Sequence, residues 1–171
     1  MQSSDELIIV ETNDARLDAY IDLLEEAASW LWTRGVYQWR PGEHRSARAE
    51  LLSRLQRGSL ILMEQGRRLA AGCLLTEIAP TCWPDTPDDA CYLSGLVVAR
   101  WAAGQDLGAR ILDEAMCAAR RRGKHRLRLD CWDGNEFLKE YYRARGFQDV
   151  GQAQEEDYWV RLFERRARGQ E

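Results

Sequence analysis

One segment between an apolar run and an amphipathic run has the composition of an anion-binding loop. It reads Ala103-Gly104-Gln105-Asp106-Leu107-Gly108-Ala109. Small residues allow the backbone to approach a ligand, and the first turn of the following helix leaves N–H groups without partners in the helix. Those groups and the helix dipole favour phosphate oxygens. The segment therefore predicts an anion site, although a plain strand-to-helix connection explains the same glycines.

A second segment carries a polar residue and two phenols on one expected helix. Asn135 is of a type that caps helix N-termini, and Tyr141 and Tyr142 follow it. Successive side chains on a helix point about 100° apart, so one tyrosine can pack in the core while the other faces a cleft. A tyrosine that faces a cleft could take part in catalysis. Simple packing is the alternative for either tyrosine.

Hydrophobic periodicity predicts the elements that must position these residues, in the order β-α-α-β-β-β-α-β-α-β-β. We expect 79–89 to be an exposed loop and 165–171 to be a frayed tail of a single domain covering 1–171. The expected strands are 7–11, 59–64, 68–78, 91–98, 126–131, 147–150 and 158–164, and the expected helices are 14–33, 46–56, 107–122 and 135–145.

Composition limits the classes of function. The 171 residues carry a net charge of −4, which does not favour nucleic acid, and no apolar run approaches the ~20 residues that span a membrane. Five cysteines are scattered and only two histidines are present, so we expect no metal site. The first residues lack the basic-then-apolar order of a secretory signal, and we expect a cytoplasmic protein.

Together, the two segments resemble the GNAT superfamily of N-acetyltransferases. That family combines a buried strand, here 92–98, with a glycine-containing loop and a helix. A later helix carries an asparagine, a tyrosine and a Gly-Phe pair, which match Asn135, Tyr142 and Gly146-Phe147. The resemblance covers nearly the whole chain. It implies an α/β fold with a mixed, mostly antiparallel central sheet of about six or seven strands flanked by about four helices.

The resemblance also implies roles for individual residues. Main-chain groups of Leu96, Val97 and Val98 would bind the pantetheine arm of acetyl-CoA. The amides of 103–109 would bind its pyrophosphate, and Asn135 would contact the arm. Tyr142 would protonate the thiolate that leaves, although packing against the cofactor is the alternative.

Two positions depart from the family pattern. Ala103 stands where the family has a basic or amide side chain, and Asp106 replaces a glycine. Aspartate tolerates the left-handed backbone better than most residues, but its charge is unfavourable beside a diphosphate. It can instead turn outward and cap the helix. Arg100 or Arg110 could supply positive charge.

The resemblance places the acceptor pocket around the first two helices and the last strands. Aromatic rings beside carboxylates suit an amine with an apolar body. We therefore expect Trp32, Trp39, Glu26 and Tyr158 to contact the acceptor. An amine must be neutral to attack, and Glu77 and Asp130 are the candidate bases.

These observations predict an acetyl-CoA-dependent N-acetyltransferase that acts on a small primary amine by direct transfer in a ternary complex. Neither nucleic acid, membrane nor metal is expected as a partner, and the chain is expected to be a monomer or homodimer. Two alternatives stay open at this stage. One is a CoA-binding sensor without catalysis, which the altered loop would suit, and the other is a peptide or protein N-acetyltransferase.

Overall fold

The computed structural model describes residues 6–84 and 89–169 of the 171-residue chain. Its strands are β1 (Leu7–Thr12), β2 (Gly58–Gln65), β3 (Arg68–Thr76), β4 (Ala90–Val98), β5 (Arg126–Trp132), β6 (Gln148–Glu155) and β7 (Tyr158–Arg166). Its helices are α1 (Leu17–Trp32), α2 (Glu43–Ser46), α3 (Arg48–Leu55), α4 (Leu107–Arg121) and α5 (Glu136–Ala144), with short 3-10 turns η1 (Asp14–Arg16) and η2 (Arg100–Ala102).

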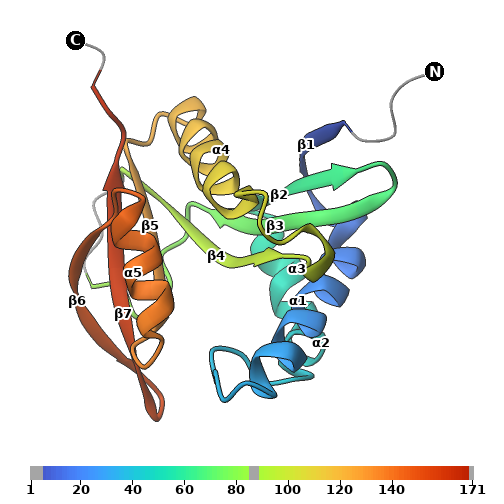
Figure 1. The fold of residues 1–171 in the computed structure, drawn as a ribbon. Helices are drawn as coiled ribbons and strands as arrows, with labels where there is room; N and C mark the ends of the chain where they lie inside the picture. Colours follow the sequence, from blue (N-terminus) through green and yellow to red (C-terminus); the bar gives the residue numbers. More distant parts are fainter. Residues whose placement is uncertain (1–5, 85–88, 170–171) are drawn as a thin grey trace.

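All seven strands form one sheet in the order β1-β2-β3-β4-β5-β7-β6 (Figure 1). Every pairing is antiparallel except that of β4 with β5, which confirms the predicted mixed, mostly antiparallel sheet. The parallel pair is short: only Ala90–Tyr92 of β4 lies in register with Arg126–Arg128 of β5. Both strands continue beyond this register, so the sheet opens between them toward Val98 and Trp132.

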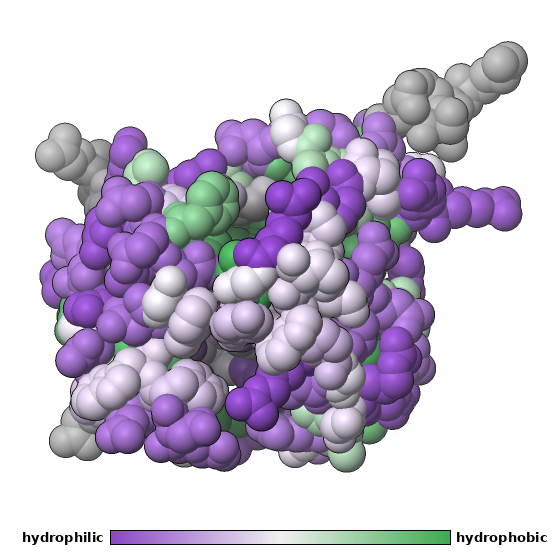
Figure 2. Space-filling view, turned by 60° about the horizontal axis from the view of Figure 1, so that its bottom comes forward, coloured by the Kyte–Doolittle hydropathy of each residue, from purple (hydrophilic) through white to green (hydrophobic). Residues whose placement is uncertain are grey.

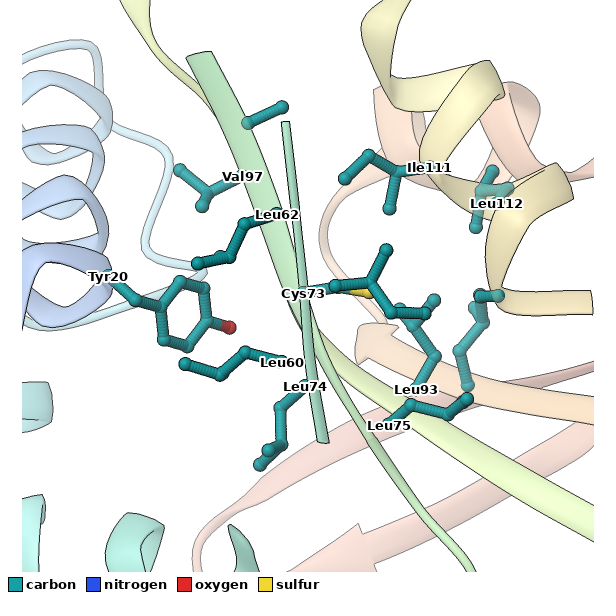
Figure 3. Packing of buried hydrophobic residues seen from close by; sticks show 14 of the residues in the cluster. Tyr20, Leu60, Leu62, Cys73, Leu74, Leu75, Leu93, Val97, Ile111 and Leu112 are labelled. Atoms are coloured by element: carbon teal, nitrogen blue, oxygen red, sulfur yellow. The ribbon is translucent and has the colours of Figure 1, made fainter. Parts of the chain in front are cut away.

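Helices cover both faces of the sheet, with α4 on one face and α1 on the other. The strands present side chains to both faces because successive residues alternate in direction. Tyr20 of α1 packs with Leu74 on one side, whereas Leu75 faces Ile111 of α4 on the other (Figure 3). Two-sided burial explains why the central strands are apolar runs without polar alternation.

Helix α5 begins where its capping residue predicts. The side-chain oxygen of Asn135 accepts a hydrogen bond from the Leu138 N–H at 3.0 Å, which satisfies one free donor of the first turn. From there the helix packs on the β5-β7-β6 side of the sheet, and the ring of Tyr142 lies 5.6 Å from that of Phe163. The cap therefore marks where α5 begins.

Four elements differ from the prediction. The expected helix 46–56 is divided into α2 and α3, with Ala47 between them. Strand β6 extends to Glu155 because an edge strand can remain polar on both faces. Strand β7 continues to Arg166, into the segment that was expected to fray. The segment 79–84 is less exposed than predicted, since Trp83 is buried against Tyr92; residues 85–88 of the same predicted loop lie outside the described residues.

Within the described ranges, no helix is long and apolar enough to cross a membrane.

Candidate functional site

The opening between β4 and β5 contains a cavity of about 460 Å³. A hollow lies near the centre of one molecular face, with apolar residues inside it and mostly polar residues around it (Figure 2). The cavity is lined by the C-terminal part of α1 with the loop after it, by β4 and the first residue of η2, by the second half of β5, and by α5 with its cap. The lining residues that matter below are Trp30, Arg34, Gln38, Trp39, Leu96, Val97, Val98, Arg100, Asp130, Asn135 and Tyr142.

Strand β4 is bulged where it borders the cavity. Its register with β3 shifts between Gly72 and Leu74, opposite Gly95, which has a φ of +62°. The hydroxyl of Tyr20 donates a 2.7 Å hydrogen bond to the Gly95 carbonyl, and a Cβ at that position would overlap the hydroxyl. A bulge takes one residue out of the sheet ladder and bends the strand. The predicted donor-site residues Leu96, Val97 and Val98 follow it and all line the cavity.

Asp130 of β5 brings a carboxyl group to the cavity wall. Burial, and after it the negative charge of Glu155, raises the pKa of Asp130 to about 6. The Cys82 thiol lies 3.8 Å from one carboxyl oxygen. A carboxyl group with a pKa near 6 is mostly ionised at neutral pH and is a stronger base than an ordinary carboxylate, which suits a general base.

Tyr142 of α5 lines the same cavity and is only 4% exposed. Burial raises the pKa of its phenol well above the ordinary value, so the hydroxyl stays protonated at any physiological pH. Its neighbour Tyr141 points elsewhere, and a Cβ at Gly108 would overlap the Tyr141 hydroxyl. The two tyrosines therefore divide as the helical spacing predicts, with Tyr142 at the cavity and Tyr141 beside the start of α4.

The glycine-containing loop lies beyond the end of β4, outside the lining of the cavity. Asp106 takes the left-handed conformation, with φ of 57°, as the sequence suggests for an aspartate at this position. Its side chain makes no capping hydrogen bond to α4. Instead, one carboxyl oxygen lies 3.3 Å from Arg145 Nη2. The loop thus leads into the first turn of α4 with an acidic side chain that is already paired.

Two arginines at the cavity both contact one indole ring. The guanidinium carbons of Arg34 and Arg100 lie 4.4 Å and 3.7 Å from the ring centroid of Trp30. Both arginines line the cavity. Cations at this position fit a ligand that carries phosphates, and the apolar β4 wall fits a flexible chain. Arg34 belongs to no motif, so sequence reasoning missed it.

Gln38 joins the two sides of the cavity. Its Oε1 accepts hydrogen bonds from the Trp132 N–H at 3.1 Å and from Asn135 Nδ2 at 3.3 Å. The loop after α1 is thereby tied to the end of β5 and the start of α5. Asn135 lines the cavity while both ends of its amide are engaged, one with Gln38 and one with the α5 cap.

Of the residues predicted to contact the acceptor, one lies at the cavity and three do not. Trp39 lines it, whereas Trp32, Glu26 and Tyr158 are exposed and do not. Glu77 lies in a separate depression, which it shares with residues that include Arg57 and Arg122. No group of three or more histidine, cysteine or acidic side chains in the described parts of the chain could hold a metal ion.

Comparison with known proteins gives the same picture as the fold. Over 135 residues, the chain is 32% identical to the uncharacterized N-acetyltransferase YesJ of Bacillus subtilis (strain 168), covering 75% of this chain and 74% of that protein. A GNAT-family acetyltransferase from Listeria monocytogenes superimposes with a TM-score of 0.74 at 23% identity, covering 94% of each chain.

A Salmonella typhimurium structure, solved with its cofactor acetyl-CoA, has a TM-score of 0.69 at 15% identity and covers 97% of this chain and 96% of that chain. The model of the acetyltransferase (GNAT) family matches residues 24–147. That span includes α4, the bulged strand and the helix of Tyr142. The chain therefore belongs to the GNAT family of acetyltransferases.

Proposed function

We propose that this chain transfers the acetyl group of acetyl-CoA to a primary amine of a small molecule, by direct attack while both substrates are bound. Family membership and the name of the curated relative support acetyl transfer to nitrogen. A Thermoplasma acidophilum relative of similar fold was solved with coenzyme A, and the Salmonella structure holds acetyl-CoA. The bulged β4, the first turn of α4 and the arginines around Trp30 form a surface suited to such a donor.

The observation that carries the proposal is that Asp130 and Tyr142 line one cavity with opposite proton preferences. Asp130, with a pKa of about 6, is ionised at neutral pH and can take a proton from the amine. Tyr142 holds its proton and can give it to the sulfur when the carbon–sulfur bond breaks. When bound, the thioester supplies the activated acetyl group. The protein thus provides a base for the attacking amine and an acid for the leaving thiolate.

The lining of the cavity supports a small acceptor rather than a long one. Gln38 holds the loop after α1 against α5, so Trp39 forms part of a wall rather than of an open groove. Asp130 and the charge of Glu155 next to it attract an ammonium group, and the Trp39 ring offers an apolar surface. We assign the base to Asp130 because Glu77 lies in the separate depression.

A panel of small primary amines, assayed by thiol release with calorimetry of CoA binding, tests this proposal. We expect turnover with at least one amine that has an apolar body. Tyr142→Phe should lower kcat about a hundredfold, because general acid catalysis contributes on that scale, while the Kd for CoA stays unchanged. CoA binding without thiol release across the panel would instead identify a sensor. Unchanged turnover in Tyr142→Phe would remove the proposed acid.

A further inference from the structure

The start of α4 carries a negative charge where a phosphate-binding turn needs none. Asp106 stands immediately before Leu107, the first residue of the helix, and its side chain is 71% exposed. In water, two unit charges about 4 Å apart repel by about 1 kcal/mol, and more where solvent is excluded. A diphosphate that approached this turn would meet the Asp106 carboxylate unless a cation offset it.

Arg145, at the end of α5, is that cation. Its guanidinium lies 3.4 Å from the ring centroid of Tyr141, and its Nη1 donates to the Tyr141 carbonyl at 3.1 Å. Its Nη2 lies 3.3 Å from the Asp106 carboxylate. Stacking and two hydrogen bonds hold the planar group in one orientation, which reduces the entropy lost when it binds an anion.

Tyr141 links this arginine to the phosphate-binding turn itself. The Tyr141 hydroxyl packs directly on Gly108, in the first turn of α4, where a Cβ would overlap it. Arg145 is therefore anchored on a ring that touches the backbone whose free N–H groups would bind the ligand. Its side chain is 26% exposed, so Arg145 remains partly accessible from solvent.

We propose that Arg145 is a donor-binding residue that contacts the pyrophosphate of CoA alongside the amides of the first turn of α4. This inference rests on the proposed use of acetyl-CoA. Asp106 holds Arg145 in place in the free protein and shares it with the phosphates once the donor is bound. The arrangement supplies from α5 the positive charge that Ala103 does not supply from the loop.

Calorimetry of CoA binding to variants of the full chain tests the contact. Loss of a charged hydrogen-bonding partner should weaken CoA binding about tenfold or more in Arg145→Gln, with partial recovery in Arg145→Lys. Arg143→Gln is the matched control, because Arg143 lies on the same turn but pairs with Glu140 and Asp149. Asp106→Asn removes the negative charge but keeps an oxygen that can accept from Arg145 and a residue type that tolerates the left-handed backbone, so it should tighten CoA binding severalfold. Circular dichroism checks that each variant is folded.

Shortened ligands separate a phosphate contact from a structural tie. The ratio of Kd between Arg145→Gln and the wild type should be equal for CoA and dephospho-CoA, and close to one for pantetheine. If the Kd ratio stayed high with pantetheine, Arg145 would only brace the two helices. If the ratio fell to one with dephospho-CoA, the contact would be with the 3′-phosphate. Either result overturns the inference. If the wild type bound no CoA, the proposed function would fall first.

Discussion

Burial at the same cavity raises the pKa of both Asp130 and Tyr142. Desolvation disfavours the ionised form of both acids. For the phenol it preserves the proton that, in the proposed reaction, passes to the leaving sulfur. For the carboxyl group it moves the pKa to about 6, which brings the change of charge close to neutral pH. A carboxyl group with an unshifted pKa would be ionised as well but would be a weaker base, since basic strength rises with pKa.

Removal of that base gives a prediction in the pH profile. We expect Asp130→Asn to lower kcat at least a hundredfold, because general base catalysis contributes on that scale. In the wild type, kcat should rise with pH around an apparent pKa near 6, since Asp130 must be ionised to accept the proton. That rising limb should be absent in the variant. The measurement is kcat between pH 5 and pH 8 with saturating donor and amine.

Glu77→Gln is the matched control, since Glu77 is the other carboxylate that the sequence offers as a base. It lies in the depression with Arg57 and Arg122, so the variant should keep its turnover and its pH profile. A collapse of activity in Glu77→Gln together with an active Asp130→Asn would reverse the assignment.

At the scale of elements, the bulge in β4 is the feature on which the cavity depends. Gly95 has a positive φ that other residues rarely adopt, and Tyr20 of α1 both bonds its carbonyl and fills the space above its α-carbon. The contact joins α1 to the strand at the point where β4 and β5 have separated. It therefore sets where the cavity wall turns away from the sheet.

A double-mutant cycle tests that contact. Gly95→Ala should destabilise the fold by roughly 2–4 kcal/mol, from backbone strain and from overlap with the Tyr20 hydroxyl. Tyr20→Phe alone should cost about 1 kcal/mol for the lost hydrogen bond. In the Tyr20→Phe background, Gly95→Ala should cost less, because the overlapping oxygen is gone. Urea denaturation of the four proteins gives the coupling energy, and strict additivity would contradict the contact.

The sequence predicted much of this architecture because most elements are marked locally. The Asn135 cap, the amphipathic α4 and the apolar central strands each follow from residues near in sequence. The bulge could not be predicted, since one glycine in an apolar strand fits a regular ladder equally well. The polar edge strand β6 was recognised only in part, because its stability comes from pairing with β7 rather than from its own pattern.

The candidate site was predictable to the extent that a motif fixes each position. Tyr142 and 96–98 occupy the cavity as the family resemblance implies, and Asp130 was one of two possible bases. Choosing between Asp130 and Glu77 required the sheet order, which places the end of β5 at the opening beside β4. Arg34 and Arg145 carry no sequence signal. Arg34 stacks on Trp30, which the fold brings beside Arg100, and Arg145 pairs with Asp106, which is distant in sequence.

On the scale of the whole molecule, strands β1–β4 and strands β5–β7 are joined through the short β4–β5 register. Two carboxyl groups on the β5–β7 side, those of Glu164 and Asp130, differ in the partners that surround them. Arg128 of β5 donates to Glu164 of β7 at 2.8 Å, with both side chains 8% exposed. Burial opposes ionisation of Glu164, but this pairing lowers its pKa overall. Asp130, two residues further along β5, has the Cys82 thiol beside it, and the charge of Arg54 offsets only part of the rise that burial causes in its pKa. One carboxylate is thus paired for stability, and the other is left reactive.

This difference predicts opposite effects of two substitutions on stability. Because folding raises the pKa of Asp130 from 3.8 to about 6, its contribution is most favourable below pH 4 and is lost as the pH rises through 6. The free energy of unfolding of Asp130→Asn should therefore exceed that of the wild type by about 1–3 kcal/mol at pH 8 and should differ little from it near pH 4.

Glu164→Gln should be destabilised by about 3 kcal/mol at pH 8, because it leaves Arg128 buried without its charged partner. That loss should stay constant down to about pH 4.5 and shrink only below it, since the lowered pKa of Glu164 makes its contribution fall away as the pH drops from 4.5 through the folded-state pKa. Urea unfolding of the three proteins from about pH 3 to pH 8 measures both trends. A less stable Asp130→Asn at pH 8 would show that the carboxylate is structurally satisfied and not held in reserve for catalysis.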